Sequence, residues 1–257
     1  MTRVAKARID QLLVDRGLAD SRAKAQALVI AGSVFLGEQR IDKPGTTVPD
    51  DAEILVRGEK IPYVSRGGVK LAGALDGFAV DPRGLRCLDV GASTGGFTDC
   101  LLQRGAAHVV AVDVGYGQLA QKLRDDPRVT NLERTNARAL TPEDIGGAAD
   151  LSVVDASFIG LAKLVDGLAR CTRAGGTLVA LVKPQFEVGR KEASRGKGVV
   201  RDEAVRAGAI ADARLALENA GFEVLAEADC VISGPKGNRE AFVHARRARL
   251  SLASAQS

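Results

Sequence analysis

The chain has 257 residues, of which 46% are hydrophobic and 26% charged, a composition typical of a globular protein with a sizeable core. The formal net charge of +4 permits a polyanionic partner but does not by itself indicate one. With no Trp and only two Tyr, the sequence disfavours nucleic-acid binding by a broad aromatic platform. No apolar stretch approaches the ~20 residues that cross a bilayer, and the first residues lack the apolar core of a signal peptide. We therefore expect a cytoplasmic protein without a membrane segment.

The first 60 residues predict a small α+β module. Apolar residues at helical spacing indicate two helices, the second capped by Asp20 or Ser21, and the short segments SVFLGEQRI and EILV follow them as strands. The segment after this module carries Pro62 and a glycine pair, which is typical of a linker. We expect an N-terminal domain at 1–60, a linker at 61–66, a second domain at 67–250 and a disordered tail at 251–257.

Beyond the linker, strands and helices alternate along the chain. The apolar runs RCLDVG, HVVAVDV, VTNLE, LSVVDA and GTLVALVK predict a parallel sheet with helices on both faces. A long alanine-rich helix near 203–220 precedes two more strands, FEVLAEADCVI and EAFVHARRA, that are joined by SGPKGNR. A hairpin that closes a parallel sheet is typical of methyltransferases rather than dehydrogenases. The sequence thus predicts an α/β fold with a Rossmann-like, seven-stranded class I methyltransferase sheet beside the small α+β domain. The basic, glycine-rich stretch at 190–201 is either a mobile loop over the substrate groove or a surface insertion.

The clearest signal of a binding site is RCLDVGASTGGFTDCLL at residues 86–102, a strand that enters a glycine turn and then a helix. Its glycines let the backbone approach a ligand, and Asp113 at the tip of the next strand can accept hydrogen bonds from ribose hydroxyls. A dinucleotide loop would have the order G-x-G-x-x-G, whereas the order here is G-A-S-T-G-G. The pattern therefore fits a nucleoside cofactor without a pyrophosphate, S-adenosylmethionine. A tight connection without any ligand is the alternative, and Asp113 argues against it.

Charged residues gather where the predicted sheet would bind a ligand, at the carboxyl ends of its strands. Asp155 and Lys183 each follow an apolar run, and Pro184 turns the chain directly after the lysine. Lys70 precedes the first strand, and the closing hairpin brings Glu240 to the same edge. A lysine in such a cleft can take a proton from a hydroxyl, which suits methyl transfer to an alcohol oxygen. Taken alone, Lys70 would be interpreted as a solvated helix residue and Glu240 as a turn residue.

Other residues give weaker signals. Two His and four widely spaced Cys without C-x-x-C spacing predict no metal site and reduced, buried thiols. The first 60 residues carry ten basic and nine acidic side chains, so any RNA affinity depends on where the charges lie. The basic residues that could form a phosphate-binding face are Lys6, Arg8, Arg22, Lys24 and Lys43, although solvated helix surface is the ordinary interpretation of such charges.

Taken together and in order, these motifs resemble the TlyA family of ribosomal RNA methyltransferases, also called the haemolysin A family. The resemblance covers nearly the whole chain, in the segments ARIDQLLVDRGLADSRAKAQ, VSRGGVKL, LDVGASTGGFTD, VDVGYGQL, ERTNAR, VVDASFIGL, LVKPQFEVG, GVVRD and SGPKGNRE. Members of this family join an RNA-binding module of the ribosomal-protein S4 type to an FtsJ-like catalytic domain. The chain departs from the pattern at Tyr63, where relatives can carry Trp.

The resemblance implies 2′-O-methylation of cytidine in ribosomal RNA, 16S or 23S or both, within ribosomal subunits. It implies a catalytic set of Lys70, Asp155, Lys183 and Glu240, in which Lys183 deprotonates or polarises the hydroxyl. Lys70 and Asp155 would position that hydroxyl, and Glu240 would fix a lysine or the ribose. The implied S-adenosylmethionine site comprises Gly91, Ser93, Thr94, Gly95, Gly96, Phe97, Asp113, Val114, Asn136 and Ala137. Candidate RNA-binding residues are Lys6, Arg8, Arg22, Lys24, Lys43 and Arg66.

Three other functions are alternatives to RNA methylation. A nicotinamide-dependent (NAD-type) oxidoreductase could use a similar sheet. A membrane-damaging haemolysin is disfavoured because the sequence has neither a spanning segment nor a strongly amphipathic basic helix. An RNA-binding or assembly factor without catalysis is disfavoured by the complete set of four catalytic residues. The sequence leaves the oligomeric state open.

Overall fold

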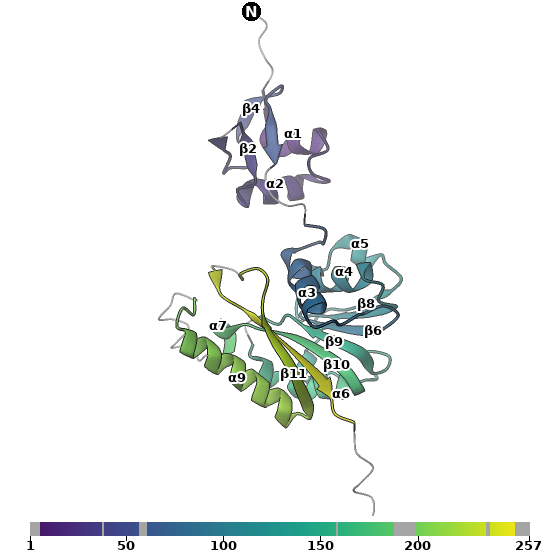
Figure 1. The fold of residues 1–257 in the computed structure, drawn as a ribbon. Helices are drawn as coiled ribbons and strands as arrows, with labels where there is room; N and C mark the ends of the chain where they lie inside the picture. Colours follow the sequence, from purple (N-terminus) through teal and green to yellow (C-terminus); the bar gives the residue numbers. More distant parts are fainter. Residues whose placement is uncertain are drawn as a thin grey trace, which may run out of the picture. The chain divides into compact units, whose positions relative to one another are not determined.

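The computed structural model describes residues 6–37, 39–56, 61–157, 159–187, 199–234 and 237–249. Contacts between Cα atoms divide the chain into two compact units, residues 1–60 and residues 61–257, which are described separately (Figure 1). The tail predicted at 251–257 and most of the basic stretch at 190–201 lie outside the described residues.

The first unit is a small α+β module, as the sequence predicts. Its elements are β1 (Lys6–Arg8), α1 (Ile9–Asp15), α2 (Arg22–Ile30), β2 (Val34–Leu36), β3 (Gln39–Arg40), β4 (Thr47–Pro49) and β5 (Ile54–Val56). Strand β1 pairs with β4, and β2 lies between β3 and β5. Ile9, Leu13 and Val29 from the helices are fully buried in a core shared with the strands. Ser21 caps α2 by accepting a hydrogen bond from the Lys24 amide at 3.3 Å.

The second unit is built on a seven-stranded sheet with the order β11-β12-β10-β9-β6-β7-β8 (Figure 1). Its strands are β6 (Arg86–Val90), β7 (His108–Val112), β8 (Val129–Leu132), β9 (Ala149–Val154), β10 (Thr172–Val182), β11 (Phe222–Asp229) and β12 (Ala241–Arg247). The strands from β10 to β8 are parallel, and β12 pairs antiparallel with both β10 and β11. The predicted closing hairpin and the class I methyltransferase sheet are therefore confirmed.

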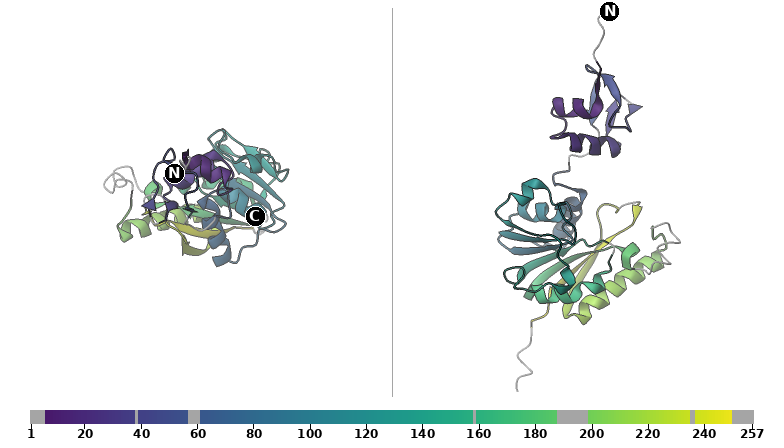
Figure 2. Two further views of the ribbon diagram at one scale, coloured as in Figure 1. Left: turned by 90° about the horizontal axis from the view of Figure 1, so that it is seen from above. Right: turned by 180° about the vertical axis from the view of Figure 1, so that it is seen from behind.

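Helices cover both faces of this sheet. They are α3 (Arg66–Gly77), α4 (Gly96–Gln103), α5 (Gln121–Arg124), α6 (Val165–Cys171), α7 (Pro184–Glu187) and α9 (Glu203–Asn219), with the 3-10 turns η1 (Ala137–Ala139) and η2 (Leu161–Lys163). On one face Leu71, Phe97 and Leu123 bring α3, α4 and α5 into one core cluster with the strands. On the other face Leu168 and Leu217 bring α6 and α9 into a second cluster. Figure 2 shows α9, in light green, beside the yellow closing strands.

The strand directions decide where functional side chains gather. Parallel strands place their carboxyl ends at one edge of a sheet, which is where α/β proteins bind ligands. Because β12 is antiparallel to β10 and Ala241 pairs with Val182, the residue before β12 comes to this same edge. The residues that follow or precede these strand ends are Gly91, Asp113, Asp155, Lys183 and Glu240.

Candidate active site

The turn between β6 and α4 shapes the site. Gly91 has φ of 85° and Gly95, the N-cap of α4, has φ of 94°, a region that side chains with a Cβ rarely adopt. A Cβ on Gly91 would lie 2.8 Å from the carbonyl oxygen of Asp155, and one on Gly96 would lie 2.2 Å from Ser65 Oγ. These glycines therefore let the turn pack closely against the end of β9 and the start of α3.

Two cavities adjoin this turn. The first, about 390 Å³, is lined by Ser65, Arg66, Gly67, Lys70, Gly91, Ala92, Ser93, Thr94, Gly96, Phe97, Asp155, Ser157, Lys183, Ser233 and Gly234. The second, also about 390 Å³, is lined by Val90, Gly91, Ser93, Val112, Asp113, Val114, Gly115, Gln118, Thr135, Asn136, Ala137, Asp155, Ala156, Ser157, Ile159 and Leu164. They share Gly91, Ser93, Asp155 and Ser157, so they form one two-part site along the carboxyl edge of the sheet.

The residues predicted to bind the cofactor lie around this site, with one exception. All of them except Gly95 line one cavity or the other. Gly95 instead approaches α5, because a Cβ there would lie 2.2 Å from Leu123 Cδ1. Asp113 is oriented by two backbone amides, from Ser93 to Oδ2 at 2.8 Å and from Gly115 to Oδ1 at 2.7 Å. Each carboxylate oxygen keeps further acceptor capacity for a ligand hydroxyl.

The four predicted catalytic residues form two ion pairs. Lys70 Nζ lies 2.5 Å from Glu240 Oε2, and Lys183 Nζ lies 2.6 Å from Asp155 Oδ1. Burial raises the pKa of Asp155, and the charge of Lys183 opposes this effect. Both lysines are buried, with 7% and 8% of their surface exposed. A buried ammonium needs a partner, so each carboxylate holds its lysine at the cavity wall. Lys70, Asp155 and Lys183 line the first cavity, whereas Glu240 contacts it through Lys70.

Ser157, which was not predicted from the sequence, completes the site. Its Oγ accepts a hydrogen bond from Lys183 Nζ at 2.7 Å, and it lines both cavities. The available signal was its spacing, because side chains two residues apart in an extended segment lie on the same side and Asp155 is two residues earlier. Ser233 and Gly234, from the loop before Glu240, also line the first cavity and were not predicted.

A buried acid lies in the strand behind the turn. Asp89 is fully buried in β6, and Thr98 donates a hydrogen bond to its Oδ2 at 2.6 Å. Within the described part of the chain, Oδ1 has no hydrogen-bond partner. Burial raises the pKa of Asp89 to about 7. The carboxyl group is therefore partly protonated at neutral pH.

The basic residues predicted to bind RNA differ in their surroundings. Arg8 and Arg22 both contact the buried Asp10, at 2.9 Å and 3.2 Å, and the hydrogen bond from Arg8 holds the pKa of Asp10 well below its usual range. Lys24 pairs with Asp20 at 2.7 Å. Roughly half of each arginine side chain stays exposed, 49% and 54%. The remaining candidates, Lys6, Lys43 and Arg66, are exposed, and Arg66 belongs to the second unit, where it lines the first cavity.

The part of the chain that the structure describes contains neither a metal-binding cluster nor a membrane-spanning helix. No group of three His, Cys, Asp or Glu side chains is arranged to hold a metal ion. Nor does any helix there have the length and apolar character needed to span a bilayer.

A parallel sheet closed by an antiparallel hairpin, with a glycine turn after β6 and an acid after β7, defines a Rossmann-like class I methyltransferase. Comparison with known proteins agrees, since residues 63–247 match the FtsJ-like methyltransferase family and residues 7–54 match the S4 domain.

Individual relatives make the assignment more specific. The chain is 50% identical over 242 residues to the 16S/23S rRNA (cytidine-2′-O)-methyltransferase TlyA of Mycobacterium tuberculosis, covering 94% of this chain and 90% of the relative. It is 37% identical to Hemolysin A of Brachyspira hyodysenteriae, covering 92% and 98%. A solved structure from Streptococcus thermophilus is 40% identical, with a TM-score of 0.75 over 96% of this chain and 90% of that one. The chain belongs to the TlyA family of FtsJ-like methyltransferases with an S4 domain.

Proposed function

We propose that this protein transfers a methyl group from S-adenosylmethionine to the ribose 2′-hydroxyl of cytidine in ribosomal RNA, acting on ribosomal subunits in the cytoplasm. The observation that carries the proposal is the pair of lysine–carboxylate ion pairs beside a two-part cavity at the carboxyl edge of the sheet. The name of the M. tuberculosis relative states the same reaction for that protein, and the S4 domain supports an RNA substrate.

The residues of the site fit the cofactor. Of the residues that the structure describes, two carboxylates and no Lys or Arg line the second cavity, which suits a nucleoside without phosphates. Asp113 would hold the ribose hydroxyls there, and Asn136 with Ala137 would border the adenine. Ser93 and Thr94 would hold the methionine portion beside the first cavity. When bound, the cofactor supplies a methyl group on a positively charged sulfur, which leaves as a neutral thioether.

The two lysines suit the positioning and deprotonation of the 2′-hydroxyl. In its neutral form Lys183 Nζ would accept the proton of the 2′-hydroxyl as that oxygen receives the methyl group. Asp155 and Ser157 hold the resulting ammonium in place. Lys70, fixed by Glu240, lines the same cavity and would position the ribose oxygen. An oxygen of this kind is present in RNA and absent from DNA.

The substitution Lys183→Ala tests this role. We expect methyl transfer to unmodified 30S and 50S subunits to fall by about 100-fold or more, because the group that accepts the proton is lost. The dissociation constant for S-adenosylhomocysteine, measured by calorimetry, should change by less than about threefold, because residues other than Lys183 form the cofactor site. Lys163→Ala, which changes an exposed lysine of η2, is the matched control and should methylate at the parental rate.

The products and ligands identify the reaction. Mass mapping of the subunits should find the new methyl groups on ribose 2′-oxygens of cytidine. Label on a base, or a parental rate for Lys183→Ala, would contradict the proposed chemistry. Heat on titration with NADH but none with S-adenosylhomocysteine would favour an oxidoreductase instead.

A further inference from the structure

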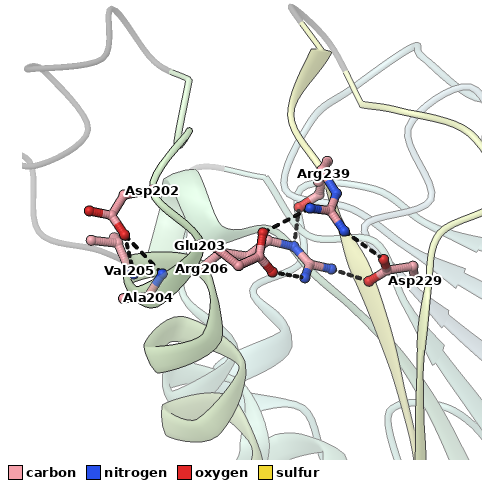
Figure 3. Close-up of polar contacts among 7 residues, drawn as sticks. All are labelled: Asp202, Glu203, Ala204, Val205, Arg206, Asp229 and Arg239. Atoms are coloured by element: carbon pink, nitrogen blue, oxygen red, sulfur yellow. Dashed lines mark hydrogen bonds and ion pairs between the residues drawn. The ribbon is translucent and has the colours of Figure 1, made fainter.

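A ring of four charged side chains lies at the start of α9, outside both cavities of the candidate active site. Arg206 contacts Glu203 Oε1 at 2.8 Å and also Asp229 (Figure 3). Arg239 contacts the same two acids, Glu203 Oε2 at 2.8 Å and Asp229 Oδ2 at 2.9 Å. Each arginine therefore contacts both carboxylates, and the four side chains close a ring (Figure 3).

The members of this ring differ sharply in exposure. The side chain of Arg206 is 9% exposed, whereas the other three are between 58% and 61% exposed. Ion pairs between exposed side chains contribute little to stability, and burying an arginine is costly unless its donors are satisfied. The burial of Arg206 thus needs an explanation other than a surface ion pair.

Arg206 also binds the backbone directly before Glu240. Its Nε donates to the carbonyl oxygen of Arg239 at 3.2 Å. The neighbouring Asn238 is also held, because its Oδ1 accepts a hydrogen bond from the Val200 amide at 3.0 Å. The segment that carries Glu240 is therefore fixed by the start of α9 and the residues that precede it.

The surroundings of Glu240 leave little room for its side chain to move. Its side chain is fully buried, 2.5 Å from Lys70 Nζ and 3.5 Å from Gln185 Nε2. A Cβ on Gly234 would lie 2.2 Å from Glu240 Oε1, so the loop on the cavity side packs directly against this carboxylate. A shift of about 1 Å in the backbone at residue 240 would disrupt the pairing of Glu240 with Lys70, and displacements of this size can slow catalysis about 100-fold.

We infer that Arg206 is a positioning residue for methyl transfer, which fixes the backbone at Arg239 so that Glu240 holds Lys70 at the wall of the first cavity. The inference rests on the proposed function, because it assigns Lys70 to the reacting hydroxyl. Arg206 itself lines neither of the two active-site cavities, so it acts through Glu240.

Single-turnover methylation of 30S and 50S subunits at saturating cofactor tests the inference. Arg206→Met should slow the step about 10-fold or more, while the affinity for S-adenosylhomocysteine stays within about threefold. Arg206→Lys should recover part of the rate, because an ammonium can still bind the Arg239 carbonyl. Arg214→Met is the matched control, since Arg214 lies in the same helix, is 53% exposed and pairs with Glu218; we expect it to keep the parental rate within twofold.

A double-mutant comparison separates positioning from general stability. If Arg206 acts through Glu240, Arg206→Met should cost less than about twofold in a Glu240→Gln background. If Arg206→Met lowers the methylation rate by the same factor in both backgrounds, or abolishes cofactor binding, Arg206 has a merely structural role and the inference is overturned.

A second variant leaves Arg206 itself unsubstituted. Combining Glu203→Gln with Asp229→Asn opens the ring at its two exposed carboxylates and should slow single turnover about threefold or more. If this variant and Arg206→Met both react at the parental rate, the inference is wrong. If the parental protein and Arg214→Met methylate neither subunit, the proposed function fails instead.

Discussion

At the scale of single residues, this chain buries charge where a partner of opposite charge is available. Lys70 and Lys183 each have a carboxylate within 2.6 Å, and Asp10 is buried among basic side chains. Among the described residues Asp89 is the exception, because its side-chain partner is the neutral Thr98 hydroxyl and burial raises its pKa to about 7. The carboxyl group of Asp89 should therefore make the stability of the second unit depend on pH.

The expected dependence has a definite sign. Because the pKa of Asp89 is raised on folding from 3.8 to about 7, the folded protein retains a proton that the unfolded chain releases. The stabilisation is fully present below about pH 4 and is lost as the pH rises through 7, at roughly 1.4 kcal/mol per pH unit in between. Urea unfolding at pH 5 and pH 7 should show a smaller loss of unfolding free energy for Asp89→Asn than for the parental protein.

A suitable control removes an acid whose pKa is lowered instead of raised. The hydrogen bond from Arg104 lowers the pKa of Asp76, so this group stays ionised in both states between pH 5 and 7. Asp76→Asn should therefore leave the difference between the two pH values as in the parental protein. Equal differences for Asp89→Asn and the parental protein would show that Asp89 does not titrate in this range.

At the scale of elements, the first residues of α3 and α4 are in close contact. This contact places the glycine turn beside the helix that carries Lys70. Ser65 caps α3, the helix that carries this lysine, by accepting a hydrogen bond from the Gly67 amide at 3.3 Å. Gly96, the first residue of α4, lies directly against this cap. The absence of a side chain at Gly96 therefore matters for the packing of α3 and α4 as well as for the cavity that both helices line.

Two helical glycines should respond in opposite ways to alanine. In Gly96→Ala the new Cβ would lie 2.2 Å from Ser65 Oγ and 2.9 Å from the Gly68 amide nitrogen, so we expect a loss of about 1–3 kcal/mol and weaker cofactor binding. In Gly208→Ala, within α9, the Cβ meets no atom within 4 Å, and the substitution should stabilise the protein by up to about 1 kcal/mol. Urea unfolding of both variants measures these changes, and destabilisation by Gly208→Ala or none by Gly96→Ala would contradict the packing described.

The elements also show what a sequence can and cannot predict. The strands β6, β7, β9 and β10 were predictable because each has five residues or more, most of them buried. Strands β1 and β4 were not, since each has three residues and is mostly exposed. The edge of the sheet at which the site residues lie was predictable from the strand directions. The closing hairpin also brought Glu240 to this edge, but the sequence left open whether Glu240 contacts a lysine or the ribose, and its pairing with Lys70, 170 residues away along the chain, is seen only in the structure.

At the scale of the whole molecule, the two units have separate hydrophobic cores. Ile9, Leu13 and Val29 belong to one cluster within residues 1–60, whereas the sheet and its helices form two clusters within residues 61–257. The candidate cofactor site and both lysine pairs lie in the second unit. The first unit matches the S4 domain and carries Arg8 and Arg22 around Asp10, so the proposed function makes it the unit that captures RNA.

This division predicts that residues 61–257, expressed alone, bind cofactor but methylate subunits poorly. The affinity for S-adenosylhomocysteine should stay within about threefold of the full chain, because every residue lining the two cavities is retained. The kcat/KM for 30S and 50S subunits should fall about 10-fold or more, and it should depend less steeply on salt because fewer phosphate contacts are made. Steady-state methylation at two KCl concentrations, about 50 and 200 mM, measures both effects. Equal kcat/KM values and equal salt dependence for the two proteins would show that RNA capture belongs to the methyltransferase unit itself.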